Sequence, residues 1–172
     1  MKIIIACILT VLLAFPAFAA DAGLRVLVVD KDPKGTNVRE SPSGKVIRVI
    51  PHTGKTDAET EMRAVTILSN QKDWFKVLLD DGTGGWMHKS VLGSCSSGTE
   101  DGAPHVYAEP THESKSFEME ADTPLFLLSG PVKADGTIWA EFSFSYAPGE
   151  KASGWFSQEV LFSNPYNDCH RK

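Results

Sequence analysis

Apolar and polar residues alternate along many short stretches of this chain, and turn residues separate one stretch from the next. A period of two is typical of a half-buried strand. Residues 26–29 and 46–50 are rich in β-branched side chains, and residues 139–146 alternate regularly, with one apolar side formed by Ala140, Phe142, Phe144 and Tyr146. Beyond residue 20 no segment shows a long helical period. The sequence therefore predicts an all-β fold.

The pattern occurs twice along the chain. Gly85-Trp86 is followed by Val91-Leu92, and Gly154-Trp155 is followed by Val160-Leu161 at the same offsets. Three other pairs of blocks keep the same order, namely residues 38–42 with 106–110, residues 63–69 with 123–129, and Trp74 with Trp139. Four blocks in one order that differ only in loop length indicate an internal duplication, with units of roughly 60 to 70 residues.

Each unit contains a predicted hairpin that carries its Gly-Trp pair. In the first unit the strands are residues 74–79 and 85–88 around a turn of Asp80, Asp81 and Gly82; in the second the turn lies at Pro148-Gly149. We expect Gly85 and Gly154 to occupy equivalent bends. The large rings of Trp86 and Trp155 are expected to fill the core, and a single 3₁₀ turn should precede each last strand.

The first 20 residues have a different character. Lys2 is followed by an almost unbroken apolar run from Ile3 to Phe15, and Ala17-Phe18-Ala19 has small residues at its first and third positions. This arrangement is typical of a secretory signal peptide. The apolar run is shorter than the ~20 residues that a membrane-spanning helix needs. We therefore expect residues 1–19 to be cleaved, giving a periplasmic or secreted protein with no membrane insertion.

The remaining chain divides into two small units with connecting segments. We expect one barrel-like domain over residues 23–95 and a second, diverged one over residues 105–163. Residues 96–104 are polar, contain glycine and proline, and read as a linker. Residues 53–63 form a polar insertion that predicts a loop, and residues 164–172 form a tail.

Two cysteines, Cys95 and Cys169, lie outside the signal segment. An exported protein meets an oxidising compartment, so an even count predicts a disulfide between them. The alternative is a metal site that combines these cysteines with His105, His112 or His170. The sequence has no Cys-x-x-Cys or His-x-x-x-His spacing to support that alternative, so we expect no metal and no cofactor.

The first unit resembles the bacterial SH3-like domain of exported proteins over residues 25–93. The resemblance rests on residues in five separate blocks: Asn37, Val38, Arg39, Pro42, Lys45, Val46, Ile47, Trp74, Lys76, Val77, Gly85, Trp86 and Leu92. It implies two SH3-like barrels in tandem. The second unit departs from the pattern, because Tyr107 stands where Arg39 stands and Glu141 replaces Lys76.

Catalytic chemistry has little support in the sequence. Asp80 and Asp81 are adjacent, but neighbouring strand residues point to opposite faces, and Asp-Gly is ordinary turn chemistry. His88, His105 and His112 could act as bases, yet no Gly-x-Ser-x-Gly nucleophile motif accompanies them. We therefore expect no enzyme and no catalytic residue.

The aromatic and charged residues near the predicted loops are better candidates. Trp74 and Trp139 each open a strand directly after a loop, where a tryptophan can lie half exposed. Arg39, Glu40 and Tyr107 lie in the first long loop of each unit. In SH3-like barrels these loops border the ligand groove. The candidate ligand-binding set is Arg39, Glu40, Trp74, Tyr107 and Trp139.

Charge and resemblance together limit the function. The formal net charge is −5, which argues against nucleic acid and anionic membrane surfaces. The resemblance implies that the ligand is cell-wall peptide or glycan. The acidic charge suits a basic protein partner better than an anionic glycan. An envelope protein as ligand, or an inhibitor or immunity-type role against a wall-degrading enzyme, is therefore an alternative. A small hydrolase in the diverged half is the third.

Overall fold

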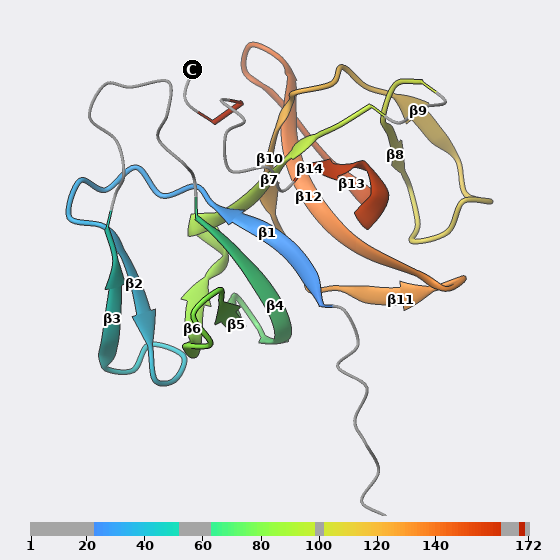
Figure 1. Cartoon of the computed structure of the whole chain (residues 1–172). Helices are drawn as coiled ribbons and strands as arrows, with labels where there is room; N and C mark the ends of the chain where they lie inside the picture. Colours follow the sequence, from blue (N-terminus) through green and yellow to red (C-terminus); the bar gives the residue numbers. More distant parts are fainter. Residues whose placement is uncertain (1–22, 52–62, 99–101, 163–168, 171–172) are drawn as a thin grey trace, which may run out of the picture.

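The computed structural model describes residues 23–51, 63–98, 102–162 and 169–170 (Figure 1). These residues form strands and two 3₁₀ turns, and the prediction of an all-β fold is confirmed. No helix within these ranges is long and apolar enough to cross a membrane. The elements are β1 (Leu24–Val28), β2 (Thr36–Arg39), β3 (Val46–Ile50), β4 (Ala64–Gln71), β5 (Trp74–Leu79), β6 (Gly84–His88), η1 (Lys89–Val91), β7 (Leu92–Ser96), β8 (His105–Tyr107), β9 (Ser116–Glu118), β10 (Pro124–Leu127), β11 (Val132–Ala134), β12 (Thr137–Ala147), β13 (Glu150–Ser157), η2 (Gln158–Val160) and β14 (Leu161–Phe162).

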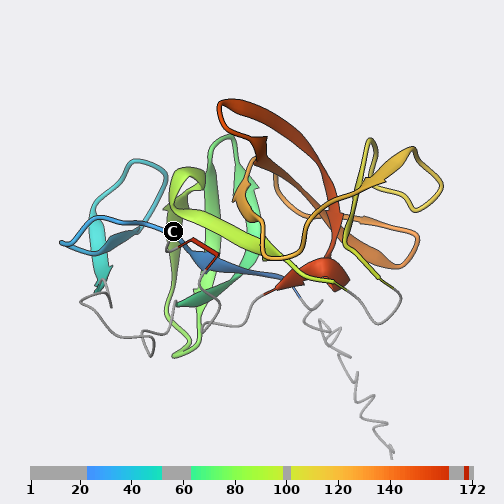
Figure 2. The same cartoon turned by 90° about the horizontal axis from the view of Figure 1, so that it is seen from above.

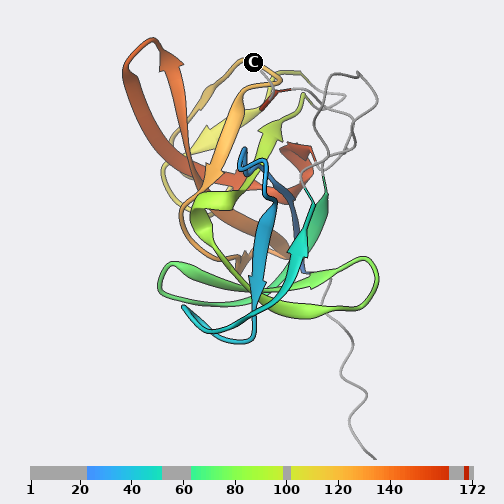
Figure 3. The same cartoon turned by 90° about the vertical axis from the view of Figure 1, so that its left-hand side faces the viewer.

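One antiparallel sheet contains all 14 strands. Its order is β3-β2-β6-β5-β4-β1-β7-β10-β12-β13-β8-β9, with β11 paired to β12 and β14 paired to β7. The two ends of this path do not meet, so the sheet is not closed. Figure 2 shows the strands of the first half on one side and those of the second half on the other, and Figure 3 shows the long β12–β13 hairpin rising away from the first half.

The predicted repeat reappears in the strand pairing. In the first half Lys76 lies opposite Trp86, and Val77 lies opposite Gly85. In the second half Glu141 lies opposite Trp155, and Phe142 lies opposite Gly154. The other side of each Gly-Trp strand also matches, with Arg39 opposite Trp86 and Tyr107 opposite Trp155. The predicted 3₁₀ turns are present as η1 and η2.

Strand β7 belongs to both halves. In the first half β1 pairs with β4 and with the last strand, β7. In the second half β7 itself pairs with β10 and with the last strand, β14. Strand β7 therefore ends the first unit and begins the second, which explains why all five of its residues are buried. Ser96, which the sequence placed in a linker, is the last residue of this strand.

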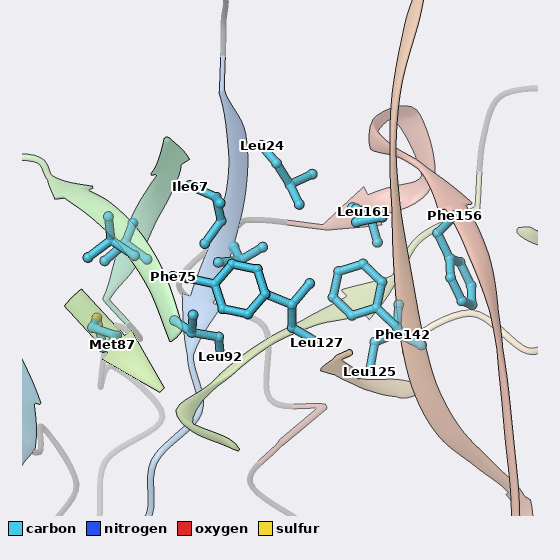
Figure 4. Packing of buried hydrophobic residues seen from close by; sticks show 14 of the residues in the cluster. Leu24, Ile67, Phe75, Met87, Leu92, Leu125, Leu127, Phe142, Phe156 and Leu161 are labelled. Carbon is cyan, nitrogen blue, oxygen red and sulfur yellow. The ribbon is translucent and has the colours of Figure 1, made fainter. Parts of the chain in front are cut away.

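The buried side chains of both halves form a continuous cluster (Figure 4). Phe75 and Ile67 from the first half join Phe142 and Phe156 from the second, and Leu92 of β7 belongs to the same cluster. Burial of each large apolar side chain contributes about 1.5–3 kcal/mol. The two halves therefore share the apolar surface on which their stability depends.

The C-terminal residues that the structure describes are attached to β7. Cys95 and Cys169 form the predicted disulfide, with their Cα atoms 6.2 Å apart. Both cysteines are buried with Leu27, Val29 and Ala64 in a second apolar cluster. The expected signal peptide, most of the loop at 53–63 and most of the tail lie outside the described residues.

Trp86 and Trp155 are not core residues, contrary to the prediction. Each is half-buried, whereas the glycine before it is buried. Side chains alternate across a strand, so Gly85 faces the core and Trp86 faces outward. The glycines do occupy equivalent places: a Cβ on Gly85 would meet Val38, and a Cβ on Gly154 would meet Val106.

Candidate functional site

The outward face of β2, β6 and β5 gathers aromatic and cationic side chains. Trp86 of β6 lies between Arg39 of β2 and Lys76 of β5, because both are its cross-strand neighbours. Two residues along β6, His88 lies opposite Trp74 of β5. Residues two apart on a strand share a face, so all five side chains lie on one side of the sheet. We call this set, Arg39, Trp74, Lys76, Trp86 and His88, the aromatic–cationic face.

Trp74 is contacted on two sides within this face. The Arg39 guanidinium carbon lies 5.9 Å from the centre of the Trp74 ring, within the range of a cation–π contact. The His88 ring meets Trp74 edge-on, with centroids 5.2 Å apart and planes at 71°. Arg39 is held in place by a 2.7 Å hydrogen bond to the Gly44 carbonyl. Trp74 and Trp86 both remain half-buried, so part of each ring meets solvent.

The hydrogen bonds of His88 define its tautomer. Its Nδ1 accepts the backbone N–H of Ser90 at 3.3 Å and lies 2.9 Å from the Ser90 hydroxyl. A ring nitrogen that accepts an N–H carries no proton of its own, so in the neutral ring the proton is on Nε2. His88 therefore keeps one N–H donor beside Trp74.

The equivalent site in the second half is closed. Tyr107 meets Trp139 edge-on at 5.1 Å, and the His112 ring lies 4.7 Å from the same tryptophan. Trp139 is fully buried, unlike Trp74. The prediction that both tryptophans would lie half exposed at a groove is thus wrong for Trp139, which is a core residue.

Two local differences bury Trp139. Its hairpin continues past it, since Lys133 pairs with Ile138 and Ala134 pairs with Thr137, whereas Trp74 directly follows its turn. The loop between β8 and β9 spans residues 108–115, two residues longer than its counterpart at 40–45. Thr111 in that loop donates a 2.9 Å hydrogen bond to Asp135 beside the β11–β12 turn. This bond holds His112 over Trp139.

The structure thus brings the predicted candidates together in two separate pairs. Arg39 contacts Trp74 in the first half, and Tyr107 contacts Trp139 in the second. Glu40 is exposed at the start of the loop after β2. Sequence reasoning missed His88 and Lys76 as members of the first site. His88 lies two residues after Trp86 on the same strand, and Lys76 lies opposite Trp86 across the predicted hairpin, so the period of two and the hairpin register could have indicated both.

No described histidine, serine or cysteine lines the cleft that the structure describes beside the β5–β6 turn. The Ser90–His88 contact resembles a nucleophile and its base, but the same Nδ1 caps η1 through the Ser90 N–H, and the two residues are neighbours in sequence. His105 and Glu118 face each other at 3.9 Å across an edge hairpin. Cys95, Cys169 and His170 lie within 4.8 Å of one another, but the disulfide occupies both sulfur atoms.

The adjacent aspartates serve the β5–β6 turn. Asp81 accepts the Thr83 N–H at 3.0 Å and pairs with Arg48, and these partners lower the pKa of Asp81 to about 2. Asp80 pairs with Arg25 at 3.2 Å. The two carboxylates border a cleft of about 290 Å³ that is lined by Arg48, Ile50, Pro51, Arg63, Ala64, Val65 and Leu79. Both aspartates already have cationic partners, as turn chemistry predicts.

Comparison with known proteins identifies no family. No family model matches the sequence, and no curated protein matches it. Among solved structures, a NlpC/P60 family protein from Bacillus cereus shares 16% identity over 80% of this chain, with a TM-score of 0.26. The match covers 55% of that chain, so this protein spans about half the length of its structural neighbour. A TM-score that low does not define the fold.

Proposed function

We propose that this protein is an exported, non-catalytic binding module that recognises cell-wall peptide or glycan through its aromatic–cationic face. The observation that carries the proposal is the pair of half-exposed tryptophans, Trp74 and Trp86, on one sheet face with Arg39, Lys76 and His88. Tryptophan and arginine are the side chains that most often dominate binding energy. The signal-like N-terminal segment of the sequence supports export.

The proposed architecture is a pair of SH3-like units fused through β7. The sequence resemblance of residues 25–93 supports this interpretation for the first unit, and the matching register supports it for the second. Because Trp139 is covered, the proposal assigns ligand binding to the first unit and a structural role to the second. Each chain then binds one ligand.

Retention on purified cell-wall sacculi tests the proposal. We expect the mature protein to co-sediment with sacculi, and Trp74→Ala and Trp86→Ala to lower the affinity by about tenfold or more, as for binding hot spots. Trp155→Ala is the matched control, because Trp155 occupies the same repeat position as Trp86 but borders Tyr107 and Glu141. Equal retention of all three variants would contradict the assignment of the site.

A protein partner is the second candidate, favoured by the outer edge of β3, which pairs with no further strand among the described residues. This strand ends the sheet, and Ile47 and Val49 are 48% and 46% exposed on it. An unpaired edge with apolar side chains can accept a strand from another protein. An envelope protein, including a wall-degrading enzyme inhibited by this chain, is the partner in that case. Capture from envelope extract without retention on sacculi would select this candidate.

A further inference from the structure

The aromatic–cationic face differs from its repeat at three equivalent positions, and at two of them, Arg39 and Lys76, it differs in charge. Arg39, Lys76 and His88 in the first half correspond to Tyr107, Glu141 and Ser157 in the second, as the register of both Gly-Trp strands shows. Each half has a tryptophan between two cross-strand neighbours, Trp86 in the first and Trp155 in the second. The neighbours of Trp155 are not cationic, so packing of the sheet does not require cations at these positions. The positive charge on this face of the first half is therefore not explained by a requirement of folding.

Arg39 and Lys76 have no carboxylate partner among the residues that the structure describes. Arg39 donates to the Gly44 carbonyl and leaves four of its five guanidinium donors for other groups. Lys76 is exposed and forms no ion pair within the described part of the chain. By contrast, the nearby Lys89 is neutralised by Asp73 at 2.7 Å, which lowers the pKa of Asp73.

The spacing of the cations defines what can bind between them. Arg39 and Lys76 lie on strands to either side of β6, and neighbouring strands are about 4.8 Å apart, so their backbones are separated by roughly 10 Å across Trp86. Guanidinium and ammonium groups favour carboxylates, and Arg binds them with two parallel hydrogen bonds. His88 adds an Nε2–H donor at the Trp74 end.

We infer that the ligand of this face is a carboxylate-bearing peptide, whose carboxylate groups bind Arg39 and Lys76 while its apolar part covers Trp86. The inference rests on the proposed function and names the chemistry that the same site recognises. A chain with a negative net charge can bind an anionic ligand in this way, because the positive charge of Arg39 and Lys76 is concentrated on one face. The equivalent face of the second half, with Glu141 and a covered Trp139, rejects the same ligand.

Chemical neutralisation of the ligand tests the inference. Sacculi are divided, and the free carboxylates of one portion are converted to primary amides with carbodiimide and ammonia. We expect the mature protein to bind the amidated portion about tenfold or more weakly, which is the effect of losing one charge-assisted hydrogen bond. Affinity for untreated sacculi should also fall as salt concentration rises.

Variants of the protein that lack one of the two cations provide a second test of the inference. Arg39→Gln and Lys76→Gln should each weaken binding to untreated sacculi about tenfold and reduce the difference in affinity between the two portions, because one of the two carboxylate contacts is then missing. Lys151→Gln, an exposed lysine on β13, is the matched control and should behave as the parent protein. Thermal unfolding of each variant shows whether it folds, and Arg39→Lys, which keeps the charge, should recover part of the binding.

The outcomes are distinct. Equal binding of the parent protein to untreated and amidated sacculi would overturn the carboxylate inference and leave the proposed function standing. Failure to bind either portion, including capture by an envelope protein alone, would overturn both. Loss on amidation together with loss in the two Gln variants supports the inference.

Discussion

At the scale of single residues, the Gly-Trp pairs show how close packing selects glycine. A Cβ at Gly85 would contact the Val38 side chain and lie 3.0 Å from the Arg39 carbonyl oxygen. We expect Gly85→Ala to destabilise the protein by about 1–3 kcal/mol, the usual cost of overpacking. The control is Gly84→Ala, where the nearest atom to a new Cβ is 3.8 Å away. Chemical denaturation measures both, and similar losses would contradict this explanation.

The two strand-opening tryptophans should respond differently to truncation. Trp139 is fully buried under Tyr107 and His112, so Trp139→Ala should cost about 3–5 kcal/mol of unfolding free energy. Trp74 is half-buried, so Trp74→Ala should cost less than half as much. Denaturant unfolding monitored by circular dichroism compares them. A larger loss of unfolding free energy in Trp74→Ala than in Trp139→Ala would contradict this assignment, because it would mean that Trp74 contributes more to stability.

His170 should make stability depend on pH. Burial lowers the pKa of His170 below its ordinary value of 6.5, although its hydrogen bond to the Ser94 carbonyl acts in the opposite direction. The unfolded chain therefore takes up the proton first, and stability is full above pH 6.5 and falls as the pH drops below it. We expect His170→Gln to show a shallower decline in melting temperature between pH 7 and 5. Parallel curves for the two proteins would contradict this role.

At the scale of elements, β7 and its disulfide determine how the halves are joined. The bond connects Cys95, near the end of β7, to Cys169 across a sequence separation of 74 residues. Closing a loop of that size in the unfolded chain corresponds to about 4.5 kcal/mol, before native strain is deducted. The disulfide therefore acts mainly on the unfolded state.

Removal of the disulfide should lower stability without changing the sheet. We expect a Cys95→Ala/Cys169→Ala variant to lose about 2–4 kcal/mol, measured by denaturant unfolding, with an unchanged far-ultraviolet spectrum. Reduction of the parent protein by dithiothreitol should give the same loss and is the control. Alkylation of the unfolded, unreduced protein should leave both cysteines unmodified; two modified cysteines would contradict the bond.

At the scale of the whole molecule, the shared strand and continuous core predict cooperative unfolding. Leu125 of β10 packs in the same cluster as Val65 and Ile67 of β4, with β1 and β7 between these two strands. Leu125→Ala should cost about 2–5 kcal/mol and lower hydrogen-exchange protection in β4 as well as in β12. The exposed Leu78→Ala is the control and should have little effect. Loss of protection confined to the second half would indicate independent units.

The hairpins and 3₁₀ turns could be predicted from the sequence because they depend on neighbouring residues. Period-two alternation, turn residues and the Gly-Trp spacing are local signals, and they placed the β5–β6 and β12–β13 hairpins and both 3₁₀ turns. Cysteine parity predicted the Cys95–Cys169 bond, because only two cysteines follow the signal-like segment. Matched blocks in the sequence aligned Lys76 with Glu141 correctly.

Burial of the tryptophans depended on the tertiary structure. Large size suggested that Trp86 was core, but the side-chain alternation that buries Gly85 turns Trp86 outward. Trp139 has the same repeat position as Trp74, yet a longer hairpin and a two-residue longer loop cover it. The loop over residues 108–115 is distant in sequence from Trp139, so no local pattern shows that it covers the ring.

The sequence alone thus determined the all-β class and the repeat, which follow from spacing along the chain, and the disulfide, which follows from the number of cysteines. Only the tertiary structure decided that β7 serves both halves and that one face of the first half collects Arg39, Lys76 and His88 around two tryptophans. Strand pairing brings together residues tens of positions apart, and the energetic gain comes from burying a common core. Which strands pair, and which face remains in water, is a property of the assembled sheet.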